Sequence, residues 1–341
     1  MKSYLAAILF GASLILCAVA VTRMSPILDD YYVWFYPAAN DWVSGRYILY
    51  DGSYSFFCAP WMLAIIVPFA ALPYDVSQIM WIAFTLLCIV VSVRCYGNFR
   101  FHLVALAIIN QPLLNLLGNG QVDAIPLLGL SLSYLAVRRR NVALLSVGLL
   151  LIATKPQNLI LASILLLLER WSWRALSLPV AAYITSGLFI GMDWILKYAQ
   201  MMPNNLYRLG PKTVIWEAPI PMPIIAIIAV ASLTCFAMIA KHDGLTKRTF
   251  SLALSTNMAY SIFAASAHFV MLIPAFLFLS RNWKIAILLY VTTWSLVLLP
   301  IGTWVGALYP LCIQVIALAN RGTVELAPIE TNMHQGRTLA P

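Results

Sequence analysis

Long uninterrupted apolar runs constrain this chain more than any other feature of its sequence. Residues 4–22, 76–93, 175–192 and 301–319 are each long enough for a helix to cross a hydrocarbon layer, which is about 30 Å thick. In lipid the backbone must satisfy its own hydrogen bonds, so runs of this length predict helices. Only 10% of the residues are charged, whereas a soluble domain has about 25%. The sequence therefore predicts an all-α polytopic membrane protein.

The net charge of +9 indicates membrane topology rather than nucleic-acid binding. The Lys and Arg residues lie in short loops between apolar runs, and nucleic-acid binding needs a basic face in water. If residues 58–73 lie along the outer interface without crossing, 15 of the 21 basic residues fall on the cytoplasmic side, as the positive-inside rule requires. If residues 58–73 cross, almost all of these assignments invert.

This topology predicts one transmembrane domain over residues 1–320, with about twelve helices. Residues 23–75 form a first external loop with juxtamembrane helices, and residues 193–218 form another external loop. The polar tail, residues 321–341, is predicted to be disordered in the cytoplasm. The predicted helices are 4–22, 76–93, 101–117, 121–137, 141–154, 156–168, 175–192, 219–240, 249–265, 267–280, 283–299 and 301–319.

Two adjacent carboxylates, Asp29 and Asp30, follow the first predicted helix and precede an aromatic segment. In a partly dry site a carboxylate becomes more basic and can act as a general base. The alternative is that both residues cap the next helix while the aromatic residues form an interfacial belt.

A polar turn, LGNGQVDA at residues 117–124, connects two apolar helices at the predicted outer boundary. Its Asn119, Gln121 and Asp123 carry amide and carboxylate groups that could bind sugar hydroxyls. A tight helical hairpin also needs a turn rich in Gly and Asn, so a structural role stays open.

Four further basic residues are candidates for binding an anion. Lys155 interrupts two apolar helices in ATKPQN, which indicates an anionic partner or a polar cavity, with snorkelling to the surface as the alternative. His268 begins an apolar helix, where an isolated histidine could be structural. No histidine pair has metal-ligand spacing, so no zinc site is predicted. Arg208 and Lys212, in the external loop, suit an anionic lipid headgroup or an ordinary interfacial loop.

Taken in order, these motifs resemble the C-type glycosyltransferases, most of all glycosyltransferase family 87, the polyprenyl-phosphate-sugar-dependent mannosyl- and arabinosyltransferase-like proteins. The resemblance covers about residues 4–300, although the usual Tyr-x-Pro is replaced by Cys58-Ala59-Pro60. The residues that carry it are 30–39, 45–51, Pro60, Gly120 with Gln121, Lys155 with Pro156, and Ser266 with His268.

The resemblance implies a C-type bundle with juxtamembrane helices, a catalytic carboxylate in the first external loop and a sugar donated by a lipid phosphate. Asp29 and Asp30 are both candidates, and the spacing to Val33 and Trp34 favours Asp30. The implied substrate-binding residues are Lys155, His268, Gln121, Asp123, Asn119, Tyr50, Asp51 and Arg208.

We hypothesise that Asp30 deprotonates an acceptor hydroxyl, which attacks the anomeric carbon of a polyprenyl-phosphate sugar with inversion. Lys155 stabilises the phosphate leaving group, assisted by His268 and by Arg208 or Lys212, while Gln121 and Asp123 orient sugar or acceptor. No cofactor is expected, and a divalent metal is not required, although Asp29 and Asp30 together could hold one.

The expected partners are the polyprenyl-phosphate donor, a lipid or glycan acceptor and the membrane, with no nucleic acid. The expected location is a bacterial plasma membrane, with the site on the external or periplasmic face. One alternative is a secondary transporter or lipid flippase with a polar cavity lined by Lys155. A non-catalytic scaffold is another.

Overall fold

The computed structural model describes residues 28, 30–46, 49–50, 56–97, 99–168, 170–209, 215, 218–261, 266–280, 282–295, 299 and 303–320. These residues are mainly helical and form no strand, so the predicted all-α class is confirmed. The predicted first helix at 4–22 and the tail at 321–341 lie outside the described residues. The helices, with π and 3₁₀ helices labelled η, are η1 (Tyr31–Phe35), α2 (Tyr36–Val43), α3 (Met62–Ala70), α4 (Tyr74–Cys95), α5 (Phe101–Ile108), α6 (Gln111–Asn119), α7 (Ala124–Arg139), α8 (Val142–Ile152), η2 (Pro156–Asn158), α9 (Ile160–Leu166), η3 (Arg170–Leu176), α10 (Ser177–Ile190), α11 (Trp194–Leu209), α12 (Met222–Asp243), α13 (Lys247–Tyr260), η4 (Ser266–Leu272), α14 (Ile273–Leu279), α15 (Trp283–Thr293), η5 (Thr303–Ala307) and α17 (Leu308–Ala319).

Three described helical segments are long and apolar enough to cross a membrane: α4, residues Trp171–Ile190 and α12. Together α5 and α6 make a fourth, but they are bent by 51°, so the single helix predicted at 101–117 is wrong. The bend falls at Asn110, whose side chain accepts a hydrogen bond from the Leu113 amide and so caps α6. The count of about twelve spans stays a prediction, because the other described helices are shorter than a full span.

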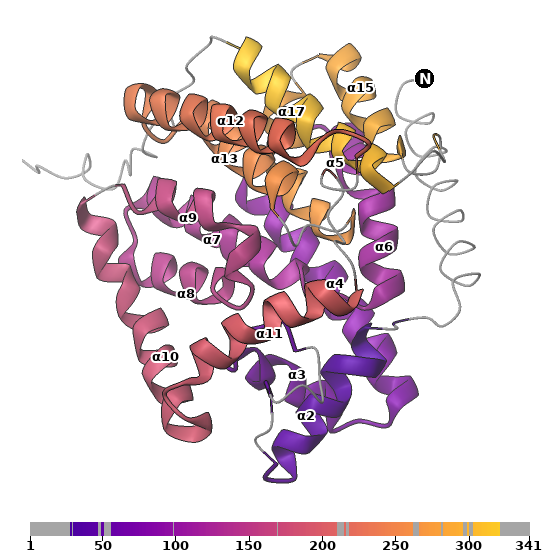
Figure 1. Cartoon of the computed structure of the whole chain (residues 1–341), viewed down its shortest axis with the longest axis vertical. Helices are drawn as coiled ribbons and strands as arrows, with labels where there is room; N and C mark the ends of the chain where they lie inside the picture. The colour runs from indigo at the N-terminus through magenta and orange to yellow at the C-terminus, as the bar shows by residue number, and fades with distance from the viewer. Residues whose placement is uncertain are drawn as a thin grey trace, which may run out of the picture.

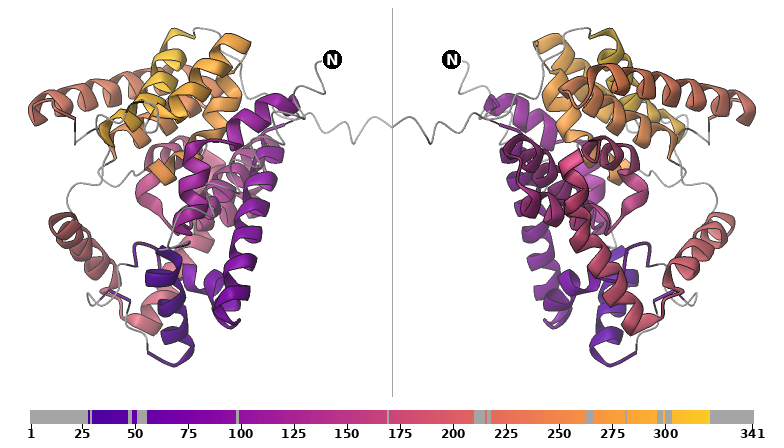
Figure 2. Two further views of the ribbon diagram at one scale, coloured as in Figure 1. Left: turned by 90° about the vertical axis from the view of Figure 1, so that its right-hand side faces the viewer. Right: turned by 90° about the vertical axis from the view of Figure 1, so that its left-hand side faces the viewer.

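Two short helices, α2 and α3, follow the first described residues. At about 1.5 Å per residue, the nine residues of α3 reach less than half way across a hydrocarbon layer. The two helices pack on each other, at the end of the molecule farthest from α12, α13 and α17 (Figures 1 and 2).

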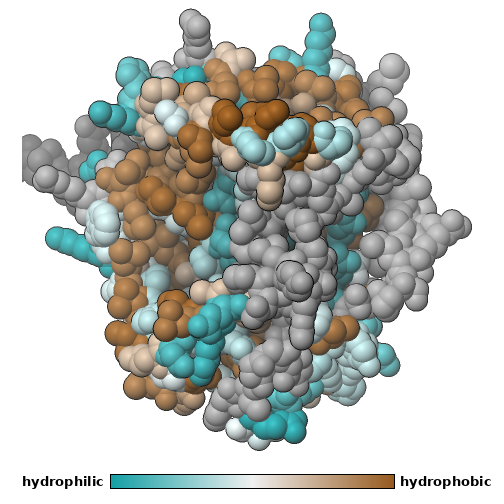
Figure 3. Space-filling view, in the orientation of Figure 1, coloured by the Kyte–Doolittle hydropathy of each residue, from teal (hydrophilic) through white to brown (hydrophobic). Residues whose placement is uncertain are grey.

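Large apolar side chains lie on the outside of α4, α10 and α12, where a soluble protein would carry charges. Brown, hydrophobic residues cover much of the left half and the top of the face in Figure 3. In a bilayer such faces contact lipid chains. The most exposed of these side chains are Ile79, Leu87, Leu188, Phe189, Met222, Ile227, Val230 and Met238.

Helix α13 is buried from Thr249 to Ala259 although most of these residues are polar or small. Its polar groups are used to join neighbouring helices. Gln314 of α17 donates to Thr256 Oγ1 at 3.2 Å, and the Tyr260 hydroxyl lies 3.0 Å from Ser232 Oγ of α12. A helix of low hydropathy can therefore sit in the centre, because its neighbours satisfy its polar side chains and shield it from lipid.

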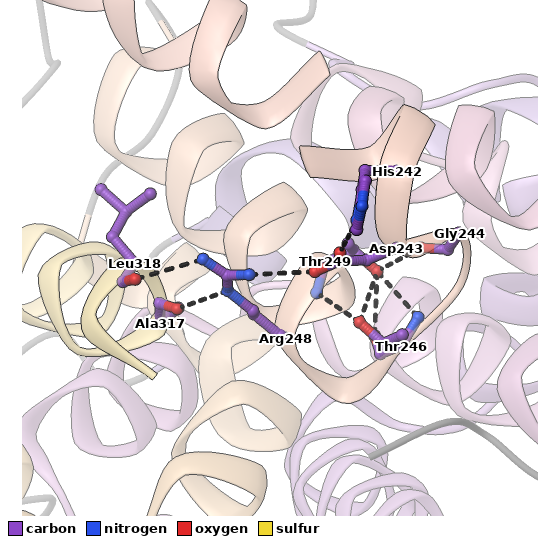
Figure 4. A network of polar contacts seen from close by, with 8 residues as sticks. All are labelled: His242, Asp243, Gly244, Thr246, Arg248, Thr249, Ala317 and Leu318. Carbon is purple, nitrogen blue, oxygen red and sulfur yellow. Dashed lines mark hydrogen bonds and ion pairs between the residues drawn. The ribbon is translucent and has the colours of Figure 1, made fainter. Parts of the chain in front are cut away.

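Basic residues gather at one end of the helix bundle. Arg248 joins three segments there (Figure 4): its guanidinium donates to Asp243 Oδ2 at 3.0 Å and to the carbonyls of Ala317 and Leu318 at 3.0 and 3.2 Å. The start of α13 meets the ends of α7 and α14 through the Phe250, Tyr134 and Phe278 rings. Since α4 and α7 also end in Arg94 and in Arg138 with Arg139, this end is the basic one.

Candidate active site

The first described residues are held against the polar turn that follows α6. The Leu28 amide donates to the Gly118 carbonyl at 2.6 Å, and Trp81 Nε1 donates to the Gly120 carbonyl at 3.2 Å. Gly120 has a φ of 66°, and a Cβ there would lie 2.6 Å from Tyr31 Cβ, so the position requires glycine. Tyr31 also stacks on Trp81 with ring centroids 5.0 Å apart. These contacts fix the start of η1, and with it Asp30, beside the turn.

Close contact between α7 and α8 brings the start of one helix beside the end of the other. Gly129 and Gly148 face each other, and a Cβ on Gly129 would lie 2.6 Å from the Gly148 carbonyl oxygen. Because the two helices are consecutive and antiparallel, Asp123, which precedes α7, lies near Thr154 and Lys155, which follow α8.

Pro156 turns the chain at the end of α8. A residue that precedes proline is pushed out of the helical region, and Lys155 accordingly has φ −144° and ψ 68°. A single 3₁₀ turn, η2, follows. Asn257 of α13 holds this turn in place, since its Nδ2 donates to the Gln157 carbonyl and its Oδ1 accepts from the Leu161 amide, both at 3.2 Å.

A buried ionic cluster forms where these segments meet. Lys155 Nζ lies 3.0 Å from Asp123 Oδ2 and 3.0 Å from His268 Nε2. Asn158 Nδ2 donates to the other oxygen of Asp123 at 3.2 Å. Asp123 is completely buried, and only 4% of Lys155 and 7% of His268 are exposed. A carboxylate so far from water needs a cation beside it, and Lys155 is that cation.

Gln121 extends the cluster to Asp30. Its Oε1 accepts from Lys155 Nζ at 3.2 Å, and its Nε2 donates to Asp30 Oδ2. Both Gln121 and Asp30 are only partly buried. A half-buried carboxylate, which a substrate hydroxyl could reach, is therefore one side chain away from a buried ammonium.

The structure brings five of the predicted site residues together: Asp30, Gln121, Asp123, Lys155 and His268. The partly buried Asn119, the last residue of α6, is two residues before Gln121. Asp29 and Asp51 lie outside the described residues, as does the side chain of Arg208, whose backbone belongs to α11.

The hydroxyl of Tyr50 is used within the protein. It donates to the Cys58 carbonyl at 2.6 Å, and burial raises the pKa of this phenol well above its ordinary value. The next amide, that of Ala59, donates to the Thr154 carbonyl at 2.8 Å. Tyr50 therefore supports the segment that lies against the Lys155 turn.

Aromatic side chains from α11 complete this side of the site. The ring of Trp194 stacks on Tyr50 with centroids 6.2 Å apart, and Tyr198 meets Tyr50 edge to face at 5.7 Å. The Tyr198 hydroxyl donates to Gln157 Oε1 at 3.0 Å. Helix α11, which crosses the middle of the molecule in Figure 1, is thus attached to the turn that carries Lys155.

Sequence reasoning missed Asn158 and Asn257 as parts of the site. Asn158 lies in the ATKPQN motif, three residues after Lys155, so the motif itself was a signal. Asn257 lies in a separate helix, and no local pattern connects it with Lys155. Among the described residues, no group of three or more His, Cys, Asp or Glu side chains could hold a metal ion.

Fold and site together define a helical membrane protein with a charged, largely dry site at the ends of its helices opposite the basic end. The sequence model of glycosyltransferase family 87 matches residues 56–259, more than half of the chain. The chain belongs to glycosyltransferase family 87, as its motifs predicted, and is a membrane glycosyltransferase. No curated protein and no solved structure matches it. The family favours the enzyme over the transporter, flippase and scaffold alternatives.

Proposed function

We propose that this glycosyltransferase moves a sugar, either mannose or a pentose-like sugar, from a polyprenyl-phosphate donor to an acceptor hydroxyl, with inversion. One observation carries the proposal: a single side chain, Gln121, connects Asp30 with Lys155. A base for the acceptor and a cation for the leaving phosphate must flank one anomeric carbon, and these two groups are near enough to do so.

Asp30 is the proposed general base. Its carboxylate takes the proton of the acceptor hydroxyl while the acceptor oxygen forms a bond to the anomeric carbon. The bond from that carbon to the phosphate oxygen breaks, and the phosphate leaves with the electron pair. A positioned base of this kind contributes about 10²- to 10⁴-fold to the rate.

Lys155 is the proposed cation for the phosphate. Its ammonium has three donors, which contact Asp123, Gln121 and His268. A phosphate oxygen must therefore replace one of these partners, and the neutral amide of Gln121, at 3.2 Å the longest of the three contacts, is the easiest to exchange. Asp123, with no exposed surface, acts as the counter-ion that orients Lys155.

The proposed site faces the outside of the cell. Asp123 precedes the first turn of α7, and Arg138 and Arg139 lie in its last turn. By the positive-inside rule the basic end of the bundle is cytoplasmic. The opposite end would then be external, at a bacterial plasma membrane, where a lipid-linked sugar and a lipid or glycan acceptor could both reach it.

Substitution of Asp30 tests the function. The full chain in lipid nanodiscs is given labelled polyprenyl-phosphate mannose or polyprenyl-phosphate arabinose, with a glycolipid extract as the acceptor. We expect Asp30→Asn to lower kcat about 10²- to 10⁴-fold. Asp41→Asn is the matched control, because Asp41 lies in the nearby helix α2 and pairs with Arg46 at the surface.

Two results would overturn the proposal. One is that the wild-type chain transfers neither sugar from these donors. The other is that Asp30→Asn keeps the rate of Asp41→Asn.

A further inference from the structure

The amide of Gln121 separates two opposite charges. Its nitrogen bonds the Asp30 carboxylate and its oxygen accepts from the Lys155 ammonium. A carboxylate can only accept hydrogen bonds and an ammonium can only donate them, so the chemistry of both neighbours fixes which way the amide points. The backbone of Gln121 is also held, because its amide donates to the Leu116 carbonyl at 3.0 Å.

Without this side chain, the two charges would attract each other across a short gap with little water. Lys155 is 4% exposed, and attraction between opposite charges is several times stronger in such a setting than in water. A direct pair would occupy the carboxylate that must accept a proton and the ammonium that must meet a phosphate. The ion pair of Lys155 with Asp123 does not involve Asp30, and it takes only one of the three ammonium donors.

We propose that Gln121 is a positioning residue that keeps the base Asp30 from pairing with the cation Lys155, and that it releases Lys155 when the donor phosphate arrives. This inference rests on the roles proposed above for the two charged residues. Before the donor binds, the Gln121 side chain thus keeps the base and the cation apart. The donor phosphate then takes the place of Gln121 at Lys155.

Other titratable groups face the same cluster, and neither substitution of Gln121 changes these residues. Asp123 comes from the residues before α7, His268 from η4 and Cys58 from the segment before α3. Burial raises the pKa of the Cys58 thiol to about 12, so this group stays neutral in any practical assay. The hydroxyl of Tyr31, beside Asp30, lies 2.7 Å from Ser77 Oγ.

Two substitutions of similar size make opposite predictions for the pH profile of kcat/KM. In Gln121→Met the spacer loses both hydrogen bonds, and Asp30 can approach Lys155. A nearby cation keeps a carboxylate ionised at lower pH, so the acidic limb should move down by about one pH unit. In Gln121→Glu a second anion faces Asp30, so the limb should move up by a similar amount. Donor KM should also rise in Gln121→Glu, because the new carboxylate competes with phosphate for Lys155.

The matched control is Gln111→Met, the same exchange at the other end of α6, which should keep the wild-type profile. General damage to the fold would lower kcat in both Gln121 variants without moving their limbs in opposite directions. If the acidic limbs of the two Gln121 variants stay at the wild-type pH, or both move in the same direction, Gln121 does not separate Asp30 from Lys155. A wild-type chain without transfer activity would instead refute the proposed function, so the two failures are distinct.

Discussion

Replacement of Lys155 by Met leaves a buried carboxylate without its cation, and this should destabilise the protein as well as inactivate it. Asp123 has no exposed surface, and its ion pair with Lys155 measures 3.0 Å. Removal of one partner from a buried ion pair costs about 3–5 kcal/mol of stability. Asn158 still bonds one oxygen of Asp123, and His268 Nε2 lies 3.6 Å from the other. We therefore expect a loss near the lower end, about 3 kcal/mol.

The double variant Lys155→Met with Asp123→Asn separates stability from chemistry. Both charges are then absent, and the asparagine occupies nearly the same volume as the aspartate. Groups that interact directly show coupling free energies of about 0.5–3 kcal/mol in a double-mutant cycle, and we expect a value near the top of that range. Sugar transfer should stay lost in the double variant, because the phosphate still lacks its cation.

The measurement is the free energy of unfolding in detergent micelles, followed by circular dichroism for the wild type, both single variants and the double variant. Transfer from the labelled polyprenyl-phosphate donor is assayed on the same samples. If the double variant is no more stable than Lys155→Met, Asp123 is not the counter-ion of Lys155. If the double variant regains wild-type transfer, Lys155 does not bind the leaving group.

One further substitution and one labelling experiment test the packing around the site. Gly148→Ala should lower the free energy of unfolding by about 1–3 kcal/mol through overpacking, since its Cβ would lie 2.2 Å from Ser133 Oγ and 2.7 Å from the Gly129 carbonyl oxygen. Unfolding in detergent measures this loss, and wild-type stability would contradict the close approach of α7 and α8. Cys58 should resist a soluble maleimide in the folded protein at pH 8, because its thiol is buried with a pKa of about 12 and only thiolates react. Mass spectrometry of labelled peptides measures the modification, and rapid modification in the native state would mean that the segment is open to water.

Most of the helices could be predicted from the sequence because their signal is local. Apolar runs locate α4, α7, α10 and α12 to within a few residues, since lipid enforces helical hydrogen bonding along each run. The bend between α5 and α6 was missed because residues 101–117 were taken as one apolar run, although Asn110, Gln111 and Pro112 interrupt it. There Asn110 caps a new helix and Pro112 lies in its first turn, which is typical of a helix start.

The candidate site was only partly predictable. Lys155 and Asp123 are costly charges in apolar surroundings, so each could be recognised by itself. Their partnership could not, because it depends on the contact of Gly129 with Gly148, which fixes how α7 and α8 pack. Tyr50 shows the opposite case: a motif residue expected at the substrate has its hydroxyl bonded to the Cys58 carbonyl.

The extent of the family match has a physical meaning for this site. The match covers residues 56–259 and so includes Gln121 and Lys155 but neither Asp30 nor His268. Both of those residues nevertheless reach the matched part, Asp30 through Gln121 and His268 through Lys155. Leu28 holds the first loop through a backbone hydrogen bond with Gly118, which does not depend on the side chain, and Tyr31 holds it by stacking on Trp81. A loop anchored partly through its backbone can vary in sequence and still bring one carboxylate to the same amide, so position in the fold is a better guide to the proposed base than similarity along the chain.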